Sequence, residues 1–543
     1  MADVTTPIIG ADFLAHYGIL VDCKNSRIID STTKISSQGQ VCHDKYEIFP
    51  IHAVSADAPD YVVQLLKEFS SISQPFSGRE PVTHKTQHYI ETTGPPVASK
   101  CRPLYGEKLQ AAKAEFEKLS ELGVVQSSKS PWSSPIHFVP KGDAWRIVGD
   151  YRRLNTATKK DCYPMNNIDS LRCLLHGKKV FSKLDLVRGY NQIPMHPDST
   201  EKTAVITPFG LFEYLRMPFG LCKASQTFQR CMNELFGPLP FVFVYIDDML
   251  IFSDNVEQHK IHLRQVFEIL ANNSLRIGLE KCEFSKKSLA FLGFDISDSG
   301  IKPRKSKCEA LENINLPETI KELHSFLGAI GFYRHHIRRF AEIAVPLHNR
   351  IKAAASSAEK IDLSDEELTA FVVLKNELAN IIEHSFIDPS SNTFVIQSDA
   401  SSRAIGAALY QFVGKEQRTI QFYSRKLSDT ESKYSTFDRE LLAAHDAVRY
   451  FLPYIDGQDV SLLTDHKPLV SAFVKKSESK SDRQARHLNF LSEHLHSIEF
   501  VKGEENIIAD FLSRPPDGTT VKVNSIHIEQ FDLDMLANEQ SAD

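Results

Sequence analysis

The chain has 543 residues, a hydrophobic content of 42% and a formal net charge of −6 at pH 7. This length is too great for one hydrophobic core and predicts roughly three or four domains. No apolar stretch approaches the ~20 residues that a membrane helix needs, and we expect no signal peptide because "MADVTTPIIG" lacks a basic region followed by an apolar core. Nine cysteines without a C-x-x-C pair argue against a zinc module and a disulfide framework, so we expect a reducing, intracellular setting.

The N-terminal part of the chain is predicted to form short strands up to about residue 50, followed by helical and extended segments. The run "YVVQLLKEFSSI" has helical spacing, and "GEKLQAAKAEFEKLSELGVV" predicts a helix that ends at Gly123. Strand-like runs follow in "PIHFVPK" and "AWRIVGDYRRLN". The cations of the second run suit a phosphate-binding surface, although a solvated surface explains such charges equally well when they are considered alone.

Two adjacent acids, Asp247 and Asp248, interrupt the apolar run "FVFVYIDDMLIF". Because buried like charges are costly, we expect the pair at the tip of a β-hairpin between "FVFVY" and "MLIFS". Asp-Asp is also an ordinary turn dipeptide, but this turn lacks Gly and Asn and is enclosed by bulky apolar residues. A divalent cation would make the clustered charge favourable. Asp185, which closes the strand-like run "VFSKLDL", is the candidate third carboxylate.

Carboxylates also stand at the ends of predicted elements in the C-terminal part. A basic helical block covers about residues 301–350, and the small, polar segment "AAASSAEKIDLSDEE" after it is a candidate linker. Beyond it, the acids in "TFVIQSD", "FDRELLAAHDAVRYF", "VSLLTD" and "NIIADFLSR" are Asp399, Glu440, Asp465 and Asp510. Each acid alone has a structural explanation, such as a turn or a helix start. Together, four acids around two metal ions suit metal-assisted hydrolysis of a phosphodiester.

The ordered segments "LDLVRGYNQI", "MPFGLCKASQTFQR" and "VYIDDMLIFS" resemble the palm of a reverse transcriptase from the gypsy-type long-terminal-repeat retrotransposons. "WRIVGDYRRLN" before them and "LAFLGF" after them extend the resemblance, which covers roughly residues 80–515. It implies that Asp185, Asp247 and Asp248 are catalytic metal ligands and that the Leu186 carbonyl is a further oxygen ligand. Two magnesium ions held in this way would support in-line phosphoryl transfer to a primer 3′-hydroxyl.

The same resemblance implies a nucleotide-binding pocket made of Lys141, Arg146, Leu186, Tyr190, Phe219, Gly220 and Gln226. Lys141 and Arg146 match residues that contact the triphosphate, for which cationic side chains are suited. Tyr190 matches the steric gate that leaves no room for a 2′-hydroxyl. Phe219 matches the pocket floor, although an aromatic residue at either position is more commonly part of a core.

The resemblance also assigns the nucleic-acid contacts around this centre. The residues that match the primer grip, a hairpin that positions the primer end, are Phe291, Leu292, Gly293 and Phe294. The basic helical block resembles the thumb, whose Lys and Arg side chains would follow the duplex backbone without reading its sequence.

A second enzymatic domain is implied by "DAS", "RELLA", "TDHKPL" and "ADFLSR", which resemble the ribonuclease H domain of the same elements. The metal-binding acids that this resemblance implies are Asp399, Glu440, Asp465 and Asp510. Cellular ribonucleases H often add a histidine before the last of these acids. Three histidines, His487, His494 and His496, lie in that interval, and the sequence does not choose among them.

The N-terminal segment "TTPIIGADFLAHYGILVDCKNSRIID" resembles the C-terminal half of a retropepsin-like protease. The Asp-Thr-Gly sequence of such proteases is absent from the 543 residues, so we expect this piece to be proteolytically inactive.

These interpretations predict a multidomain α+β and α/β protein, in which a right-hand polymerase with fingers, palm and thumb precedes a ribonuclease H-like domain with a mixed sheet. The expected domains are the protease remnant (1–50), fingers and palm (51–300), thumb (301–355), linker (356–390), ribonuclease H (391–518) and a flexible tail (519–543).

The expected function is RNA- and DNA-directed DNA synthesis from dNTPs, combined with hydrolysis of RNA in RNA–DNA hybrids. We expect two Mg²⁺ ions in each active centre, with Mn²⁺ as a substitute. The expected partners are an RNA template, a DNA primer, the RNA–DNA hybrid and dNTPs, with no membrane. The expected location is a cytoplasmic virus-like particle, and whether a nuclear stage follows stays open. The choice between a monomer and a homodimer also stays open. The rival interpretation is a binding or capsid-associated protein with an inactive polymerase fold, against which all seven acids are present.

Overall fold

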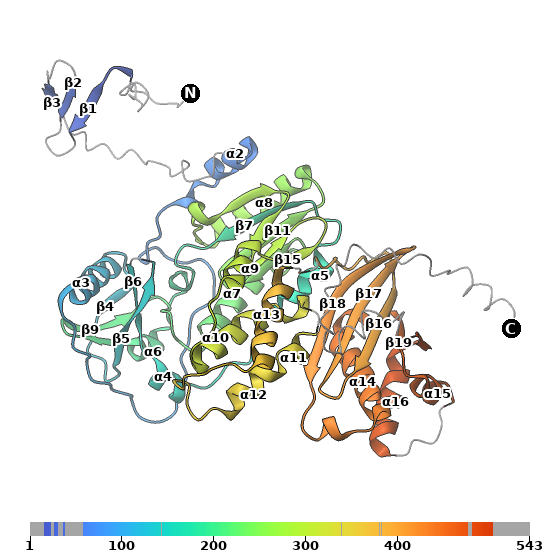
Figure 1. Ribbon diagram of the computed structural model, residues 1–543. Helices are drawn as coiled ribbons and strands as arrows, with labels where there is room; N and C mark the ends of the chain where they lie inside the picture. Colours follow the sequence, from blue (N-terminus) through green and yellow to red (C-terminus); the bar gives the residue numbers. More distant parts are fainter. Residues whose placement is uncertain are drawn as a thin grey trace. The chain divides into compact units, whose positions relative to one another are not determined.

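The computed structural model describes residues 16–22, 27–30, 36–38, 58–142, 144–337, 339–379, 381, 383–475 and 481–502 (Figure 1). The chain divides into two compact units, Met1–Pro50 and Ile51–Asp543. The first unit contains an antiparallel sheet of β1 (Ile19–Asp22), β2 (Arg27–Asp30) and β3 (Ser36–Gln38). The Ile-Ile-Gly sequence of residues 8–10 lies outside the described residues, and the protease resemblance stays a prediction.

A four-stranded antiparallel sheet carries the first group of predicted acids. Its strand order is β10 (Val242–Tyr245), β11 (Asp248–Ser253), β7 (Val180–Asp185) and β12 (Glu283–Lys286). Helix α7 (Ala224–Phe236) packs on β10, and α8 (Val256–Asn272) packs on β11 and β7. The interior residues of β11 are buried, which explains why the sequence of this strand is a continuous apolar run and does not alternate between apolar and polar residues.

A five-stranded sheet is built from segments that lie on both sides of β7 in the sequence. Its order is β4 (Val125–Ser127), β9 (Gly210–Tyr214), β8 (Val205–Thr207), β5 (Ser134–Lys141) and β6 (Ala144–Gly149). Helix α3 (Gly106–Glu121) contacts β4 and β6. Gly123 follows this helix with a φ of +69°, so the predicted helix end is confirmed.

Short helices connect these elements. They are α2 (Asp60–Glu68), η2 (Ser70–Ser73), α4 (Arg152–Ala157), η3 (Ile168–Ser170), α5 (Leu171–Leu174), η4 (Gly189–Gln192), α6 (Pro197–Thr200), η5 (Glu201–Thr203) and η6 (Leu279–Lys281). No helix among the described residues combines the length and the apolar character that crossing a bilayer requires.

The predicted thumb begins after a small antiparallel sheet of β13 (Leu289–Phe291), β14 (Phe294–Ile296) and β15 (Ile301–Pro303). The helices that follow are α9 (Lys305–Glu312), α10 (Ile320–Gly331), η7 (Arg334–His336), α11 (Phe340–Ile343), α12 (Val345–Ala353) and α13 (Asp365–Ala379).

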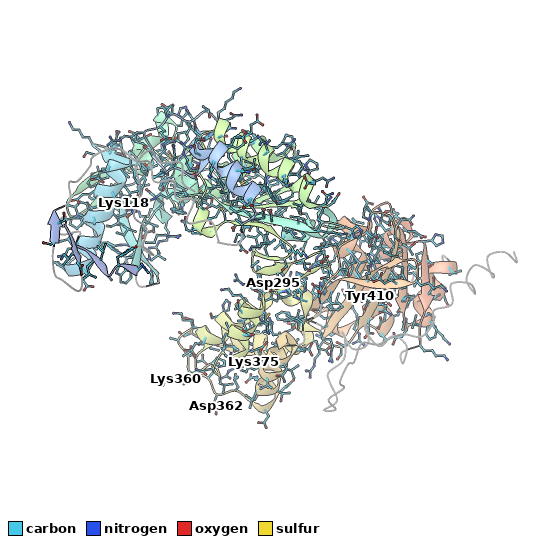
Figure 2. All side chains as sticks on the ribbon, turned by 90° about the horizontal axis from the view of Figure 1, so that it is seen from above. Lys118, Asp295, Lys360, Asp362, Lys375 and Tyr410 are labelled. Atoms are coloured by element: carbon cyan, nitrogen blue, oxygen red, sulfur yellow. The ribbon has the colours of Figure 1, made fainter. Side chains whose placement is uncertain are left out.

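Helix α13 contradicts the prediction of a linker over residues 356–390. It packs against α9 and α12, and its Phe371 ring lies 4.6 Å from that of Phe326 in α10. Lys375, labelled in Figure 2, donates a hydrogen bond of 2.9 Å to the Ile314 carbonyl and lies over the Phe371 ring. The prediction was wrong here because the small, polar composition belongs to the turn before the helix, whereas the helix itself presents an apolar face to the thumb.

The C-terminal sheet is mixed, as predicted. Its order is β18 (Glu416–Lys426), β17 (Ala404–Val413), β16 (Thr393–Ala400), β19 (Asp459–Thr464) and β20 (Ser497–Phe500). The β16–β19 and β19–β20 pairs are parallel, whereas the pairs on the other side are antiparallel. Its helical elements are η8 (Glu431–Lys433), α14 (Thr436–Ile455), α15 (Lys467–Lys475) and α16 (Asp482–His494). Tyr410, labelled in Figure 2, is buried in the centre of β17.

The C-terminal sheet and its helix α14 contact the palm and thumb elements directly. Arg172 in α5 is almost fully buried and donates a hydrogen bond of 3.0 Å to the carbonyl of Ile420 in β18. Tyr450 in α14 forms a hydrogen bond of 3.0 Å with Nδ1 of His335 in η7. These contacts join residues that lie far apart in the sequence, and no local pattern predicted them.

Candidate active sites

The first candidate centre lies at one end of the β10–β11–β7–β12 sheet. β10 and β11 form an antiparallel hairpin in which Tyr245 pairs with Asp248, so Ile246 and Asp247 form a two-residue turn. β11 also pairs with β7, and this register places Asp248 opposite Asp185. The predicted hairpin is therefore confirmed, and the three acids from two distant segments meet at one end of the sheet.

Asp247 has the most perturbed carboxyl group of this centre. Burial, and then the negative charges of Asp185 and Asp248, raise its pKa from the ordinary 3.8 to about 7. Its Oδ1 atom is buried and has no hydrogen-bond partner. Gly189 lies so close that a Cβ atom at this position would come within 2.5 Å of the same oxygen. A buried, unpaired carboxylate oxygen beside two further carboxylates is a donor set that fits a hard divalent cation.

Two lysines that the sequence did not single out approach the other acids. The Lys281 Nζ atom lies 3.1 Å from Asp185 Oδ1, and the Lys183 Nζ atom lies 3.5 Å from Asp248 Oδ1. Lys183 precedes Asp185 by two positions on β7, so the strand period could have placed both on one face. These cations offset part of the repulsion among the carboxylates.

The predicted nucleotide pocket contains a cluster of side chains from separate elements. The Tyr190 ring lies 5.0 Å from the Phe219 ring, and the Arg146 guanidinium lies over Phe219 at 5.3 Å. The Tyr190 hydroxyl forms a hydrogen bond of 2.8 Å with Ser225 Oγ. Gly220 has a φ of +94°, which favours glycine over other residues. The structure thus brings Arg146, Tyr190 and Phe219 together, and their roles toward a nucleotide stay predictions.

The other predicted pocket residues have different surroundings. Leu186 is buried and forms an isolated bridge with Ile277. Gln226 in α7 is half-buried, and its Oε1 atom has no hydrogen-bond partner. Lys141 is the last residue of β5 and pairs with Ala144, whereas its side chain lies outside the described part of the structure.

The predicted primer grip is a tight hairpin between β13 and β14. Phe291 pairs with Phe294, and the turn residues Leu292 and Gly293 have φ values of +48° and +89°. The Gly293 carbonyl accepts a hydrogen bond of 3.2 Å from the Tyr333 hydroxyl after α10. The hairpin geometry is confirmed, and its contact with a primer stays a prediction.

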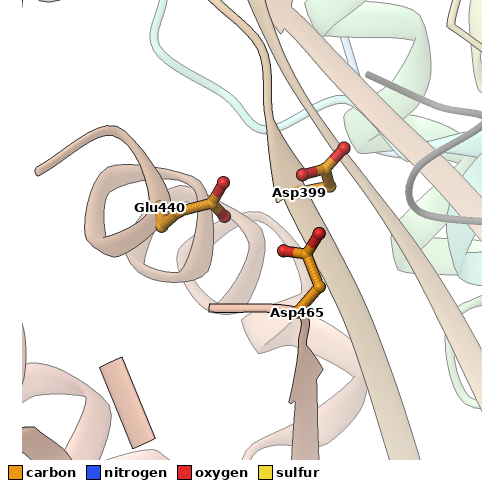
Figure 3. A group of neighbouring side chains, drawn as sticks. All are labelled: Asp399, Glu440 and Asp465. Carbon is orange, nitrogen blue, oxygen red and sulfur yellow. The ribbon is translucent and has the colours of Figure 1, made fainter. Parts of the chain in front are cut away.

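The second candidate centre is formed by Asp399, Glu440 and Asp465 (Figure 3). Asp399 lies near the end of β16, Glu440 projects from α14 and Asp465 follows the end of β19. One carboxylate oxygen of each residue lies within 4.8 Å of the other two, a grouping found only here among the residues that the structure describes. Parallel pairing of β16 with β19 brings the ends of these strands together.

Glu440 is the most perturbed acid of the second centre. Burial raises its pKa well above the ordinary value of 4.5, and the charges of Asp399 and Asp465 raise it further. Its Oε2 atom is buried and accepts no hydrogen bond. The three carboxylates of Asp399, Glu440 and Asp465 also form a set of oxygen ligands that fits a divalent cation. Asp510, the predicted fourth acid, lies outside the described residues.

The three histidines near this centre have other neighbours. His487 stacks on His445 with ring centroids 4.1 Å apart, and burial lowers its pKa to about 4. His494 packs edge-on against Phe490, and His496 lies 4.0 Å from an Asp459 oxygen. The choice among them stays open.

Family comparisons agree with the positions of both centres. Residues 139–296 match the family described as "Reverse transcriptase (RNA-dependent DNA polymerase)", and residues 389–494 match "RNase H-like domain found in reverse transcriptase".

Curated relatives from Drosophila melanogaster are similar over most of the chain. The retrovirus-related Pol polyprotein from transposon 297 is 36% identical over 462 residues, which are 83% of this chain and 42% of that protein. The corresponding polyprotein from transposon opus is 32% identical over 98% of this chain and 55% of its own length. The polyprotein from transposon gypsy is 30% identical over 93% of this chain and 50% of its own length. The chain therefore spans about half the length of the curated relatives it matches.

Solved structures of a foamy viral protease–reverse transcriptase share the fold. The structure in complex with an RNA/DNA hybrid has a TM-score of 0.72 at 23% identity and covers 88% of this chain and 64% of that chain. A second structure, in complex with double-stranded DNA, has a TM-score of 0.72 at 22% identity, and the match covers 83% of this chain and 80% of that chain. At this level of identity the likeness establishes the fold alone, a polymerase with fingers, palm and thumb followed by a ribonuclease H-like domain.

Proposed function

Because the chain contains a reverse transcriptase domain followed by a ribonuclease H-like domain of the kind found in retrotransposon Pol polyproteins, we propose that it copies RNA, and then DNA, into DNA. The substrates would be a primed template and dNTPs, and the second domain would hydrolyse the RNA of the resulting hybrid. The observation that carries this proposal is the hairpin register, which joins Asp185, Asp247 and Asp248 at one end of the palm sheet. We further propose that the chain acts in a cytoplasmic virus-like particle.

In the polymerase centre, Asp185 and Asp247, with the Leu186 carbonyl and Asp248, would hold two Mg²⁺ ions. The ions, when bound, would supply charge neutralisation and Lewis acidity at the reacting phosphate. Arg146, already beside the pocket aromatics, would bind the triphosphate together with Lys141. The Tyr190 ring would lie beneath the sugar and exclude a 2′-hydroxyl.

In the ribonuclease H centre, Asp399, Glu440 and Asp465 would hold the metal ions together with Asp510. The buried Glu440 carboxyl would bind a cation by losing its proton, so cation binding and the pH would be linked. Asp399 lies on β16, Asp465 directly follows β19, and Glu440 lies on α14, which packs on both strands. This packing would hold the three acids in a fixed arrangement before substrate binds.

The direct test is primer extension on a poly(rA) template annealed to oligo(dT), with Mg²⁺, followed by cleavage of a labelled RNA–DNA hybrid. The parent protein should show both activities. Asp247→Asn should remove extension alone, because Asn binds a metal ion less well than Asp at nearly the same volume. A parent chain that binds the primed template but shows neither activity would favour the rival interpretation, a binding protein with an inactive polymerase fold.

A further inference from the structure

Gln229 in α7 holds the backbone of the turn that carries Asp247. The Gln229 side chain is fully buried, and its Oε1 atom accepts a hydrogen bond of 2.9 Å from the Ile246 backbone amide. Its Nε2 atom donates to the Val244 carbonyl at 3.1 Å, on the β10 side of the same turn. One amide group therefore contacts the turn and the strand that leads into it. We propose that Gln229 is a positioning residue for the polymerase centre, acting through the backbone of Ile246 on Asp247.

The turn needs an external partner because its own sequence does not favour its conformation. Ile246 has a φ of +54°, in the left-handed region that β-branched residues rarely adopt. Two-residue hairpin turns normally place Gly, Asn or Asp where φ is positive. A backbone conformation of this kind persists when the surroundings determine it, and the bond to Gln229 is the contact that the structure provides at the Ile246 amide.

The Gln229 amide is itself held in one orientation. Its Nε2 atom also donates a hydrogen bond of 2.9 Å to Asn233 Oδ1, one turn further along α7. The Val244 carbonyl accepts a second bond, of 2.7 Å, from Asn166 Nδ2. Loss of the Gln229 amide would leave the Ile246 N–H group, which is partly buried, without this acceptor, and an unmade hydrogen bond of this kind costs free energy.

The Asp247 carboxylate has little room to move on its other side. A Cβ atom at Gly189 would lie within 2.5 Å of Asp247 Oδ1, so the Gly189 backbone bounds the carboxylate there. The turn is thus held from α7 and bounded at Gly189. A displacement of about 1 Å at a reacting centre costs roughly 100-fold in rate, so a modest shift of the turn would be measurable.

The test compares three variants of the full chain. Gln229→Met keeps the side-chain length but removes the amide, whereas Gln229→Glu keeps an oxygen that can accept from Ile246. Thr227→Val is the matched control, because Thr227 lies in the same helix and makes a buried hydrogen bond of 2.9 Å with His88 Nδ1. This control removes a buried bond from α7 without touching the turn.

Three measurements separate positioning from general destabilisation. They are the kcat of DNA synthesis as a function of Mg²⁺ concentration, hybrid cleavage by the same protein, and hydrogen exchange at the Ile246 amide in the metal-free chain. Gln229→Met should lower kcat by about 10- to 100-fold, raise the Mg²⁺ concentration needed for half-maximal rate and accelerate exchange at Ile246. Gln229→Glu should lie between Met and the parent. Thr227→Val should match the parent in all three, and hybrid cleavage should be unchanged throughout.

The inference rests on the proposed polymerase function, and the measurements distinguish the failure of each. A parent chain without DNA synthesis would contradict the proposed function, whereas hydrogen exchange would still test the contact with Ile246. Parental kcat, Mg²⁺ dependence and exchange in Gln229→Met would overturn the inference. Equal losses in Gln229→Met and Thr227→Val would also overturn it, because they would show a general effect of α7. If Gln229→Met is insoluble, parental values of all three quantities in Gln229→Ala would likewise overturn the inference.

Discussion

Replacing Asp247 with Asn is expected to stabilise the metal-free protein while it removes DNA synthesis. The pKa of Asp247 is about 7, against an ordinary 3.8, because of burial and then of the charges on Asp185 and Asp248. The folded chain therefore binds this proton more tightly than the unfolded chain, so stability is lost as the pH rises from about 4 to 7. The difference between the two pKa values corresponds to about 4 kcal/mol above pH 7, since each tenfold change in proton affinity is worth about 1.4 kcal/mol.

Asn removes the charge but does not reproduce the hydrogen bonding of a protonated carboxyl, so part of this energy should be recovered. In EDTA at pH 8, the free energy of unfolding of Asp247→Asn should exceed that of the parent by about 2–4 kcal/mol, and the excess should shrink as the pH approaches 4. Urea denaturation of both chains at several pH values, followed by circular dichroism, measures this difference. A difference that does not change with pH, or a variant less stable than the parent at pH 8, would refute the argument from burial and repulsion.

Three further changes test other parts of the proposal. Asp465→Asn should stop cleavage of RNA in a hybrid and leave DNA synthesis intact, because the two carboxylate centres lie at separate sheets. A gel with labelled RNA and labelled primer reports both activities, and loss of both activities in a folded variant would show that the centres are coupled. Tyr190→Val should raise the relative kcat/KM for ribonucleotides by roughly tenfold or more, because it removes the ring that we propose lies against the sugar. An unchanged ratio of ribonucleotide to deoxynucleotide incorporation would contradict the proposed role of Tyr190 as a steric gate. Deletion of residues 1–50, which form a separate compact unit, should leave both activities measurable, and failure to obtain soluble protein would show that this unit supports the rest of the fold.

The parts of the site that could be predicted from the sequence are those in which a short segment contains its own signal. The hairpin at Asp247 was predictable because an apolar run interrupted by two acids has few stable arrangements. The grouping of Asp399 with Asp465 was predictable because each acid follows a strand pattern, and the parallel register then brings the strand ends together. In both cases the chemistry of the side chains and the local period agreed.

The parts that were missed depend on partners far away in the sequence. Arg172 binds a carbonyl 248 positions later, and nothing near Arg172 in the sequence specifies that contact. Helix α13 was predicted to be a linker because the polar segment before it dominated the local composition, while its packing partners lie in the thumb. Gln229 could have been suspected as a polar residue on a buried face of an amphipathic helix, but the Ile246 amide that it contacts becomes its neighbour only after the palm folds.

The close approach of Gly189 to Asp247 also bears on how related gene copies should be interpreted. Any side chain at position 189 would overlap the carboxylate oxygen, so a copy could retain every proposed catalytic acid and still lose the proposed polymerase activity through this one position. Its proposed ribonuclease H acids would be unaffected, because they lie at another sheet and on the helix α14 that packs on that sheet. A survey that scores degenerate copies by their acids alone would therefore count such copies as intact, and residue 189 is the site whose inspection would correct the count.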